Sequence, residues 1–249
     1  MVYNLSMLTQ VTPNIYISDF DSSNDRPRLG YIKGKRFNIM IDAGNSPDHF
    51  NSFINECQLI GLDIPDYILI THWHWDHVFG LSGSLIPTIC SKLTQDKLIE
   101  MSDWKWDDAS MKKRLLTGDD IEFCDLNIRI EYANPLDIRV RKADIIFDKE
   151  LQFNIGDRTC LLYHIDNDHS LDSIVIFIPE DKVLFLGDII SPDYHHGDAH
   201  YTKHKFNHLV QKLFEFDFEY AIHGHTEVFS RETLKLFFLN PEAFIEESN

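Results

Sequence analysis

Residues 70–80, ITHWHWDHVFG, end an apolar run with four side chains that can bind a metal ion. The four are His72, His74, Asp76 and His77. The first three occupy alternate positions, so in an extended segment they project to one side while Trp73 and Trp75 project to the other. Imidazole and carboxylate groups suit a borderline cation such as zinc. Four donors in one short loop exceed what a single ion takes from such a loop, and the stretch therefore predicts a site for two ions.

The segments around this loop alternate between strand-like and helix-like patterns. Strand patterns cover residues 37–44, 64–72 and 218–225, and each ends on or near an acid or a histidine. A Ser-Pro start followed by apolar residues at helical spacing predicts a helix over residues 46–62. Strands and helices that alternate in this way are typical of layered α/β proteins.

The second half of the chain is expected to add further strands and helices. Helical patterns cover residues 90–117 and 200–216, strand patterns cover residues 121–165, and residues 173–188 have the form of a β-hairpin. Trp104 and Trp106 lie near the middle of the first helical pattern, and LNIRIEY is among the strand patterns. Because candidate ligands come from most of the chain, we expect a single domain over residues 1–249.

Composition and charge exclude several classes of partner. The chain has 249 residues, and its formal net charge of −17 repels phosphate backbones and anionic membranes, so we expect no nucleic acid and no membrane as a partner. The amino terminus lacks a secretory signal pattern, and no apolar run approaches the ~18 residues of a membrane span. We therefore expect a cytoplasmic protein. The four cysteines are far apart, as expected for reduced thiols.

Several motifs together resemble those of the metallo-β-lactamase superfamily of metal-dependent hydrolases. HWHWDH matches the HxHxDH signature of that family. DAG at Asp42, DHSLDS at His169, LGD at Asp188 and HGH at His225 follow in the order of the family's motifs. The segment IDNDHSLDS departs from the Gly-rich loop that the family usually has near His169. The resemblance implies an α/β fold, a four-layer αββα sandwich.

The resemblance also implies a ligand set for two metal ions, zinc first, with iron or manganese as alternatives. The first ion would be held by His72, His74 and His169, and the second by Asp76, His77 and His225. Asp188 would bridge the two, and Asp42 would orient a ligand histidine without binding metal itself. Asp76 would also handle the proton of the hydroxide, which makes it the candidate catalytic residue.

These residues predict a hydrolase in which a hydroxide shared by two metal ions attacks a small ester, thioester or lactone. The substrate would be a small molecule. The alternative is an iron-dependent oxidoreductase of the same fold, such as a persulfide dioxygenase. Metal content and oxygen uptake would separate the two. No sequence pattern indicates the oligomeric state.

Further histidines and a tyrosine lie near the predicted ligands. We expect Tyr194 and His195, a few residues after Asp188, to line the substrate pocket. His223 and His164 are expected to be structural residues. His196, His200, His204 and His208 recur every four residues, and the last three are predicted to share one face of a helix. We expect that face to be partly solvated, and a substrate-binding or accessory metal face is the alternative.

Overall fold

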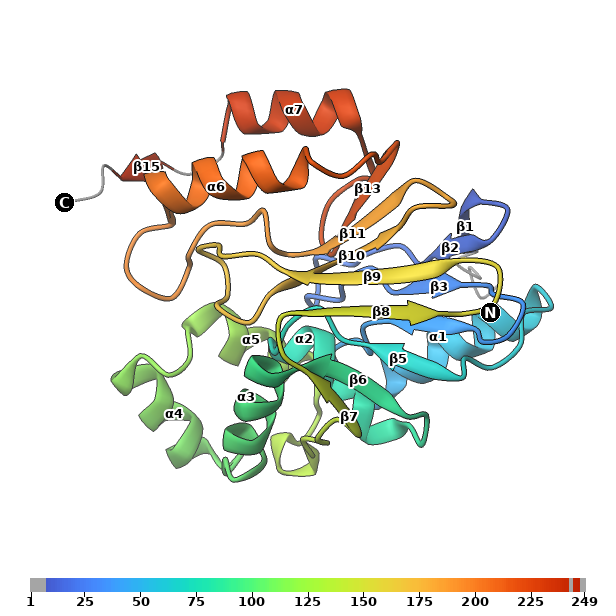
Figure 1. Ribbon diagram of the computed structural model, residues 1–249. Coiled ribbons are helices and arrows are strands. Elements are labelled where there is room, and N and C mark those ends of the chain that lie inside the picture. Colours follow the sequence, from blue (N-terminus) through green and yellow to red (C-terminus); the bar gives the residue numbers. More distant parts are fainter. Residues whose placement is uncertain (1–7, 242–243, 247–249) are drawn as a thin grey trace.

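Two sheets lie face to face in the computed structural model, which describes residues 8–241 and 244–246, and helices cover the outer face of each sheet (Figure 1). The first sheet contains, in spatial order, β1 (Thr9–Thr12), β2 (Ile15–Ile17), β3 (Gly30–Ile32), β4 (Ile39–Ile41), β5 (Tyr67–Leu69), β6 (Thr88–Ser91) and β7 (Ile145–Phe147). Strands β1 to β4 are antiparallel, and β4 to β7 are parallel.

The second sheet is formed by the later part of the chain. Its spatial order is β14 (Phe229–Ser230), β13 (Tyr220–His223), β11 (Val183–Gly187), β10 (Ile174–Ile178), β9 (Thr159–His164) and β8 (Glu150–Asn154). Only β11 and β13 pair in parallel within it. A separate pair joins β12 (His200–Thr202) to β15 (Phe244–Glu246). The predicted hairpin over residues 173–188 is therefore confirmed as β10 and β11.

Helices form the two outer layers. The first sheet is covered by α1 (Pro47–Leu59), α2 (Trp75–Val78), α3 (Lys92–Ser102), α4 (Asp108–Thr117) and α5 (Glu122–Glu131), and the second by α6 (Lys203–Leu213) and α7 (Arg231–Leu239) (Figure 1). Two 3₁₀ turns complete the helical segments, at Phe79–Gly83 and Pro135–Asp137. Ser46 caps α1 by accepting a hydrogen bond from the His49 N–H, and Pro47 opens the helix, as predicted.

Three apolar clusters separate the four layers. Successive side chains of a strand point to opposite faces, so a strand buried on both faces feeds two clusters. In β10, Ile174, Ile176 and Ile178 enter the cluster between the sheets, while Val175 and Phe177 pack beneath α6 and α7. The third cluster lies between the first sheet and helices α1 to α5. This arrangement confirms the four-layer αββα architecture.

Three predicted elements differ from the structure. Residues 126–131 belong to the helix α5, not to a strand, although the apolar residues of 126–132 alternate. Acidic residues in the first turn and the ion pair between Arg129 Nε and Asp125 Oδ2, 2.8 Å apart, favour the helix, which buries Ile128. The helical pattern over 90–117 is interrupted after α3, and Asp107 caps α4 by accepting from the Ser110 N–H at 3.1 Å.

The third difference concerns the repeated histidines. His200 lies in β12, whose pairing with β15 keeps that segment extended, and α6 begins only at Lys203. His204 and His208 are therefore on the helix, and His200 is not. The predicted stripe of three histidines on one helix face is wrong.

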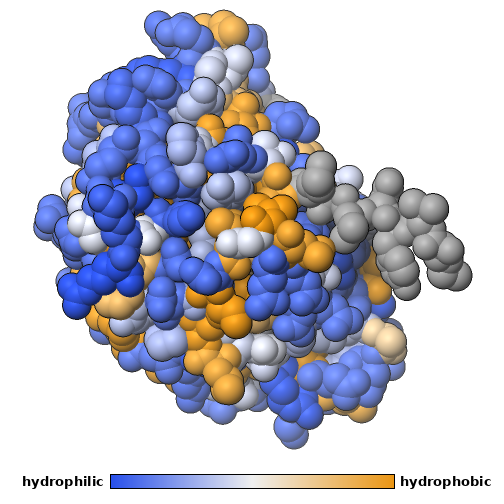
Figure 2. Space-filling view, turned by 90° about the vertical axis from the view of Figure 1, so that its right-hand side faces the viewer, coloured by the Kyte–Doolittle hydropathy of each residue, from blue (hydrophilic) through white to orange (hydrophobic). Residues whose placement is uncertain are grey.

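The side of the molecule seen in Figure 2 is largely hydrophilic, with hydrophobic residues gathered along its middle. Within residues 8–241 and 244–246, no helix is both long and apolar enough to cross a membrane.

Candidate metal centre

The candidate ligands meet at the edge of the sandwich where four strands end. Parallel pairing of β4 with β5, and of β11 with β13, brings the carboxyl ends of each pair to the same edge. Asp42 follows β4, the HWHWDH segment follows β5, Asp188 follows β11, and His225 follows β13. Strand ends thus bring together residues that lie up to about two hundred positions apart in the chain.

Three imidazoles form one group, called here the imidazole group. It consists of His72, His74 and His169. The Nε2 atoms of His72 and His169 lie 3.3 Å apart, and the ring centroids of His74 and His169 are separated by 4.6 Å. His72 is fully buried. Three ring nitrogens therefore converge on one point, as expected for ligands of a single ion.

A second set of side chains, called here the carboxylate group, lies beside the first. It consists of Asp76, His77, Asp188 and His225. Asp188 Oδ2 is 3.4 Å from His77 Nε2 and 3.2 Å from His225 Nε2. The same oxygen is 3.9 Å from His169 Nε2 in the imidazole group. Asp188 therefore lies where the two groups meet, which is the position expected for a bridging ligand.

Asp42 is linked to one ligand of each group, to His77 directly and to His72 through Thr71. Its Oδ2 atom accepts hydrogen bonds from His77 Nδ1 at 2.8 Å and from the Thr71 hydroxyl at 2.8 Å. Because the Thr71 hydroxyl donates to Asp42, its oxygen accepts from His72 Nδ1, 3.1 Å away. These contacts leave the Nε2 lone pairs of both histidines facing the candidate site. Asp42 thereby fixes the tautomers of His77 directly and of His72 through Thr71.

Two glycines permit the close approach of the ligand loops. A Cβ on Gly224 would lie 2.3 Å from Asp188 Oδ1, and a Cβ on Gly187 would lie 2.6 Å from the Thr71 hydroxyl oxygen. Gly187 also has a positive φ of 52°, which favours glycine. In the LGD and HGH motifs, glycine therefore avoids a steric clash that any side chain at these two positions would cause.

The electrostatics of the two groups differ. Burial lowers the pKa of His72 and His74 and lowers that of His169 to about 4, so these imidazoles are neutral. Burial also disfavours charge on His77 and His225, yet nearby carboxylates outweigh it, raising the pKa of His77 and raising that of His225 to about 10. The carboxylates of Asp76 and Asp188 thus attract positive charge to their group, whereas the imidazole group contains no charged residue.

The donor chemistry of both groups fits divalent cations. The His77 Nε2 and Asp188 Oδ1 atoms are buried and have no hydrogen-bond partner among the described residues. Buried polar atoms without partners are uncommon in proteins, and metal coordination is one way to satisfy them. Nitrogen and carboxylate oxygen ligands at this spacing suit zinc or a similar ion.

Comparison with known proteins places this fold and this site in a family. The family model of the metallo-β-lactamase superfamily matches residues 29–225. This range covers most of the chain and all seven residues of the two groups. The chain belongs to the metallo-β-lactamase superfamily. Members of this superfamily are mostly metal-dependent hydrolases, and the fold binds divalent metals.

Solved structures support the same fold. A metallo-β-lactamase from Pontibacter korlensis has a TM-score of 0.66 at 15% identity, with 94% of this chain and 98% of that chain covered. The DIM-1 metallo-β-lactamase has a TM-score of 0.64 at 16% identity, with 93% and 94% covered. The stereoselective inverting sec-alkylsulfatase Pisa1 from Pseudomonas sp. has a TM-score of 0.68 at 10% identity, and the match covers 94% of this chain and 40% of Pisa1. No functionally curated protein matches in sequence.

A cavity of about 480 Å³ opens beside both groups of this superfamily site. Tyr194 and His195 line it, as expected from the sequence, and the His195 ring is 5.4 Å from the His74 ring. The two residues belong to the loop between β11 and β12, which leaves the site directly after Asp188. The structure therefore places both residues at the cavity, and their contact with a substrate stays a prediction.

Sequence reasoning missed several lining residues. These are Asp25, Ile121, Phe123, Cys124 and Ser191. Asp25 lies outside the stretch that the superfamily model matches, and its Oδ1 atom is 3.6 Å from His225 Nδ1. Burial, with the neighbouring Asp76 carboxylate, raises the pKa of Asp25 to about 7. Helical spacing of apolar residues could have placed Phe123 on a helix, but no motif in the sequence marks Asp25.

The remaining histidines contact structural partners. His164 Nε2 lies 2.7 Å from the Leu171 carbonyl oxygen. His223 is buried, its Nδ1 accepts from the His225 N–H at 3.0 Å, and its Nε2 is 3.1 Å from the Ser191 hydroxyl oxygen. Trp75 is buried in the cluster under the helices, and Trp73 packs against that cluster, as predicted. The predicted extended segment ends at His74 and not at Asp76, because α2 begins at Trp75.

Proposed function

We propose that this protein is a metal-dependent hydrolase that holds two divalent ions, zinc in the first place, and cleaves a small ester, thioester or lactone. The observation that supports it best is the convergence of seven ligand-type side chains in two adjoining groups, beside a cavity of about 480 Å³. A pocket of this size suits a small molecule. The net charge of −17 argues against phosphate-rich partners.

Each residue has a definite part in this proposal. The imidazole group would hold one ion, and Asp76, His77 and His225 would hold the other, with Asp188 shared between them. When bound, such a pair of ions supplies a water whose pKa is lowered toward ~7 and polarises the substrate carbonyl. Asp42 would keep the Nε2 lone pairs of His72 and His77 directed at the ions.

Asp76 would manage the proton of the attacking water. Its Oδ2 atom is 3.0 Å from His225 Nε2 and 3.1 Å from His77 Nε2, so the carboxylate is held at the centre of its group. From this position it can take the proton of the water and return it to the leaving group. General acid–base catalysis of this kind contributes about 10²–10⁴-fold.

The surroundings of Ser191 and Cys124 argue against a serine or cysteine nucleophile in this cavity. Because His223 Nδ1 accepts the His225 N–H, its Nε2 carries the proton and donates to Ser191, and so it cannot act as the base for that hydroxyl. Burial raises the pKa of the Cys124 thiol well above its usual range, so a thiolate is disfavoured. The nucleophile is therefore assigned to water.

Elemental analysis of untreated protein, followed by a hydrolysis panel, tests the proposal. The panel contains lactones, thioesters, aryl esters, phosphodiesters and β-lactams. We expect two ions per chain and hydrolysis that a chelator abolishes and added zinc restores. A single iron per chain, with oxygen uptake in the presence of a persulfide, would instead identify the iron-dependent oxidoreductase.

A further inference from the structure

The cavity wall outside the two ligand groups combines one carboxylate with aromatic and aliphatic side chains. Asp25, Ile121, Phe123 and Tyr194 contribute to it. Among the described residues that line this cavity, none is a lysine or an arginine. With metal ions bound by the ligand groups, Asp25 is the acid of the wall that binds no ion. The wall therefore offers aromatic rings and a carboxyl group, which a bound cation would keep ionised, to whatever part of a substrate lies beyond the reacting carbonyl.

Asp25 is held in the wall by its backbone. It has a positive φ of 56° and lies in a turn closed by paired hydrogen bonds between the Asp21 and Arg26 backbones, both 2.9 Å long. Its side chain is only 13% exposed. Within the described part of the chain, no donor makes a hydrogen bond to the Asp25 carboxylate, and its ion-pair partner is His225 Nδ1 at 3.6 Å. A buried carboxylate with so few partners favours a cationic ligand.

From these contacts we infer that Asp25, with Phe123 and Tyr194, recognises a positively charged group on the substrate, an ammonium or a quaternary ammonium. The inference rests on the proposed hydrolase function and names its substrate class: cationic esters, thioesters or lactones. Aromatic rings that line the same cavity as a carboxylate can attract such cations through the ring quadrupole, in addition to the attraction of the charge. The acidic surface of the protein would also raise the rate at which cations arrive.

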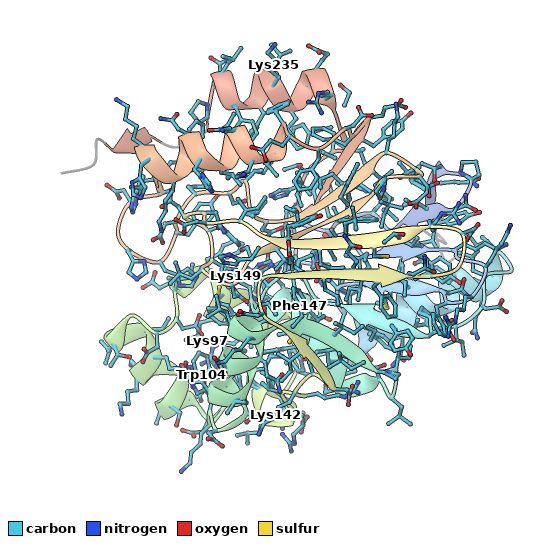
Figure 3. All side chains as sticks on the ribbon, in the orientation of Figure 1. Lys97, Trp104, Lys142, Phe147, Lys149 and Lys235 are labelled. Carbon is cyan, nitrogen blue, oxygen red and sulfur yellow. The ribbon has the colours of Figure 1, made fainter. Side chains whose placement is uncertain are left out.

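The neighbouring cleft gives no comparable site for an anionic substrate. It shares His74, His169 and His195 with the cavity and contains two lysines. Lys97 is 3.0 Å from Glu100 and lies over the Trp73 and Trp104 rings, the latter labelled beside it in Figure 3. Lys205 is 3.6 Å from Asp168 and donates to the Asn167 carbonyl. Both ammonium groups already have protein partners.

A pair of isosteric thioesters tests the inference on the zinc-loaded protein. Acetylthiocholine carries a quaternary ammonium, and S-(3,3-dimethylbutyl) thioacetate has a neutral carbon in its place. We expect the wild type to prefer acetylthiocholine by about tenfold in kcat/KM, mainly through KM. Asp25→Asn keeps the shape and an acceptor but removes the charge, and it should abolish this preference while changing the neutral thioester less than about twofold.

Asp119→Asn is the matched control, because it removes one negative charge from an exposed residue near the neighbouring cleft. It should leave the preference unchanged. Equal losses on both thioesters in Asp25→Asn, with lower zinc content, would reduce Asp25 to a positioning residue for His225 and overturn the inference. So would a wild type with no preference.

Calorimetric titration with choline and 3,3-dimethylbutan-1-ol separates this inference from the hydrolase proposal. If neither thioester is hydrolysed, tighter binding of choline than of the neutral alcohol, lost in Asp25→Asn, supports the cation site and leaves only the hydrolase proposal without support. If choline and the alcohol bind equally, or if Asp25→Asn does not change choline binding, the cation site is wrong whatever the hydrolysis result.

Discussion

The imidazole group and the carboxylate group lie side by side but attract metal ions for different reasons. Three neutral rings leave the charge of a divalent ion uncompensated, so binding there depends on how well the lone pairs are directed. Asp76 and Asp188 supply two negative charges to the other group, so binding there also gains from charge. Metal binding should therefore depend most on ligand orientation in the imidazole group and most on charge in the carboxylate group.

Asp188→Ala is expected to have the largest effect, because it removes a charge from one group and the link to the other. Loss of residues that only orient ligands costs about 10–100-fold, so loss of a shared ligand should lower kcat by more than about 100-fold. Elemental analysis should show fewer than two ions per chain, and circular dichroism should be unchanged because β10 and β11 are buried on both faces.

Asp217→Ala, which removes an exposed carboxylate, is the control for Asp188→Ala. It should retain the activity and the metal content of the wild type. Wild-type turnover and two ions per chain in Asp188→Ala would show that the two groups bind metal without a bridging ligand. Asp188 would then not link them.

Asp42→Asn and Thr71→Val separate orientation at the two groups. Asn tolerates the positive φ of 57° at position 42, but its single amide oxygen cannot replace both Oδ1, which accepts from the Thr71 N–H, and Oδ2, which accepts from His77 and the Thr71 hydroxyl. Asp42→Asn should weaken zinc binding at both groups by about 10–100-fold. Thr71→Val removes the hydroxyl that links Asp42 to His72 but keeps the hydrogen bond between His77 and Asp42, so it should weaken the imidazole group alone.

A two-step titration with a competing fluorescent chelator measures both affinities in these variants. If Thr71→Val weakens both steps equally, or neither, the relay from Asp42 to His72 does not orient the imidazole group. The orientation of the ligand side chains would then not explain a difference in metal affinity between the two groups.

Tyr194→Phe tests a contact to the substrate and not to the metal. The cavity position of Tyr194 allows its hydroxyl to donate to a carbonyl or leaving-group oxygen. Losing one such bond should lower kcat or raise KM by about tenfold, with both metal affinities unchanged. Kinetics on the best substrate of the panel, together with elemental analysis, measure this. Unaltered kinetics would remove Tyr194 from the substrate site.

His208→Ala should have the smallest effect. His208 is exposed on α6, away from both groups, and surface substitutions change stability by at most about 0.5 kcal/mol. Turnover and metal content should stay within about twofold of the wild type. A loss of one ion per chain would revive the accessory metal face considered for these histidines.

Much of the centre could be predicted from the sequence because its ligands stand in short motifs at strand ends. Residues 70–80 carry both the alternation that predicts an extended segment and the ligands themselves. Asp25 could not be predicted, since no motif marks it and only the fold brings it to the cavity wall, 3.6 Å from His225 Nδ1. The alternating apolar residues in α5 would fit a strand equally well. The ion pair between Arg129 and Asp125, one helical turn apart, favours the helix instead. His200 lies outside the helix because its strand pairs with residues 244–246, a contact that the local sequence does not indicate.

The ligands come from both sheets of the sandwich, and this affects how the protein would unfold. His72 and His77 extend from the first sheet, whereas Asp188 and His225 extend from the second, so ions held by both sets would fasten one sheet to the other. Separating the sheets would then require releasing the ions, which slows unfolding as well as shifting its equilibrium. The metal content would accordingly set the lifetime of the folded chain under proteolysis.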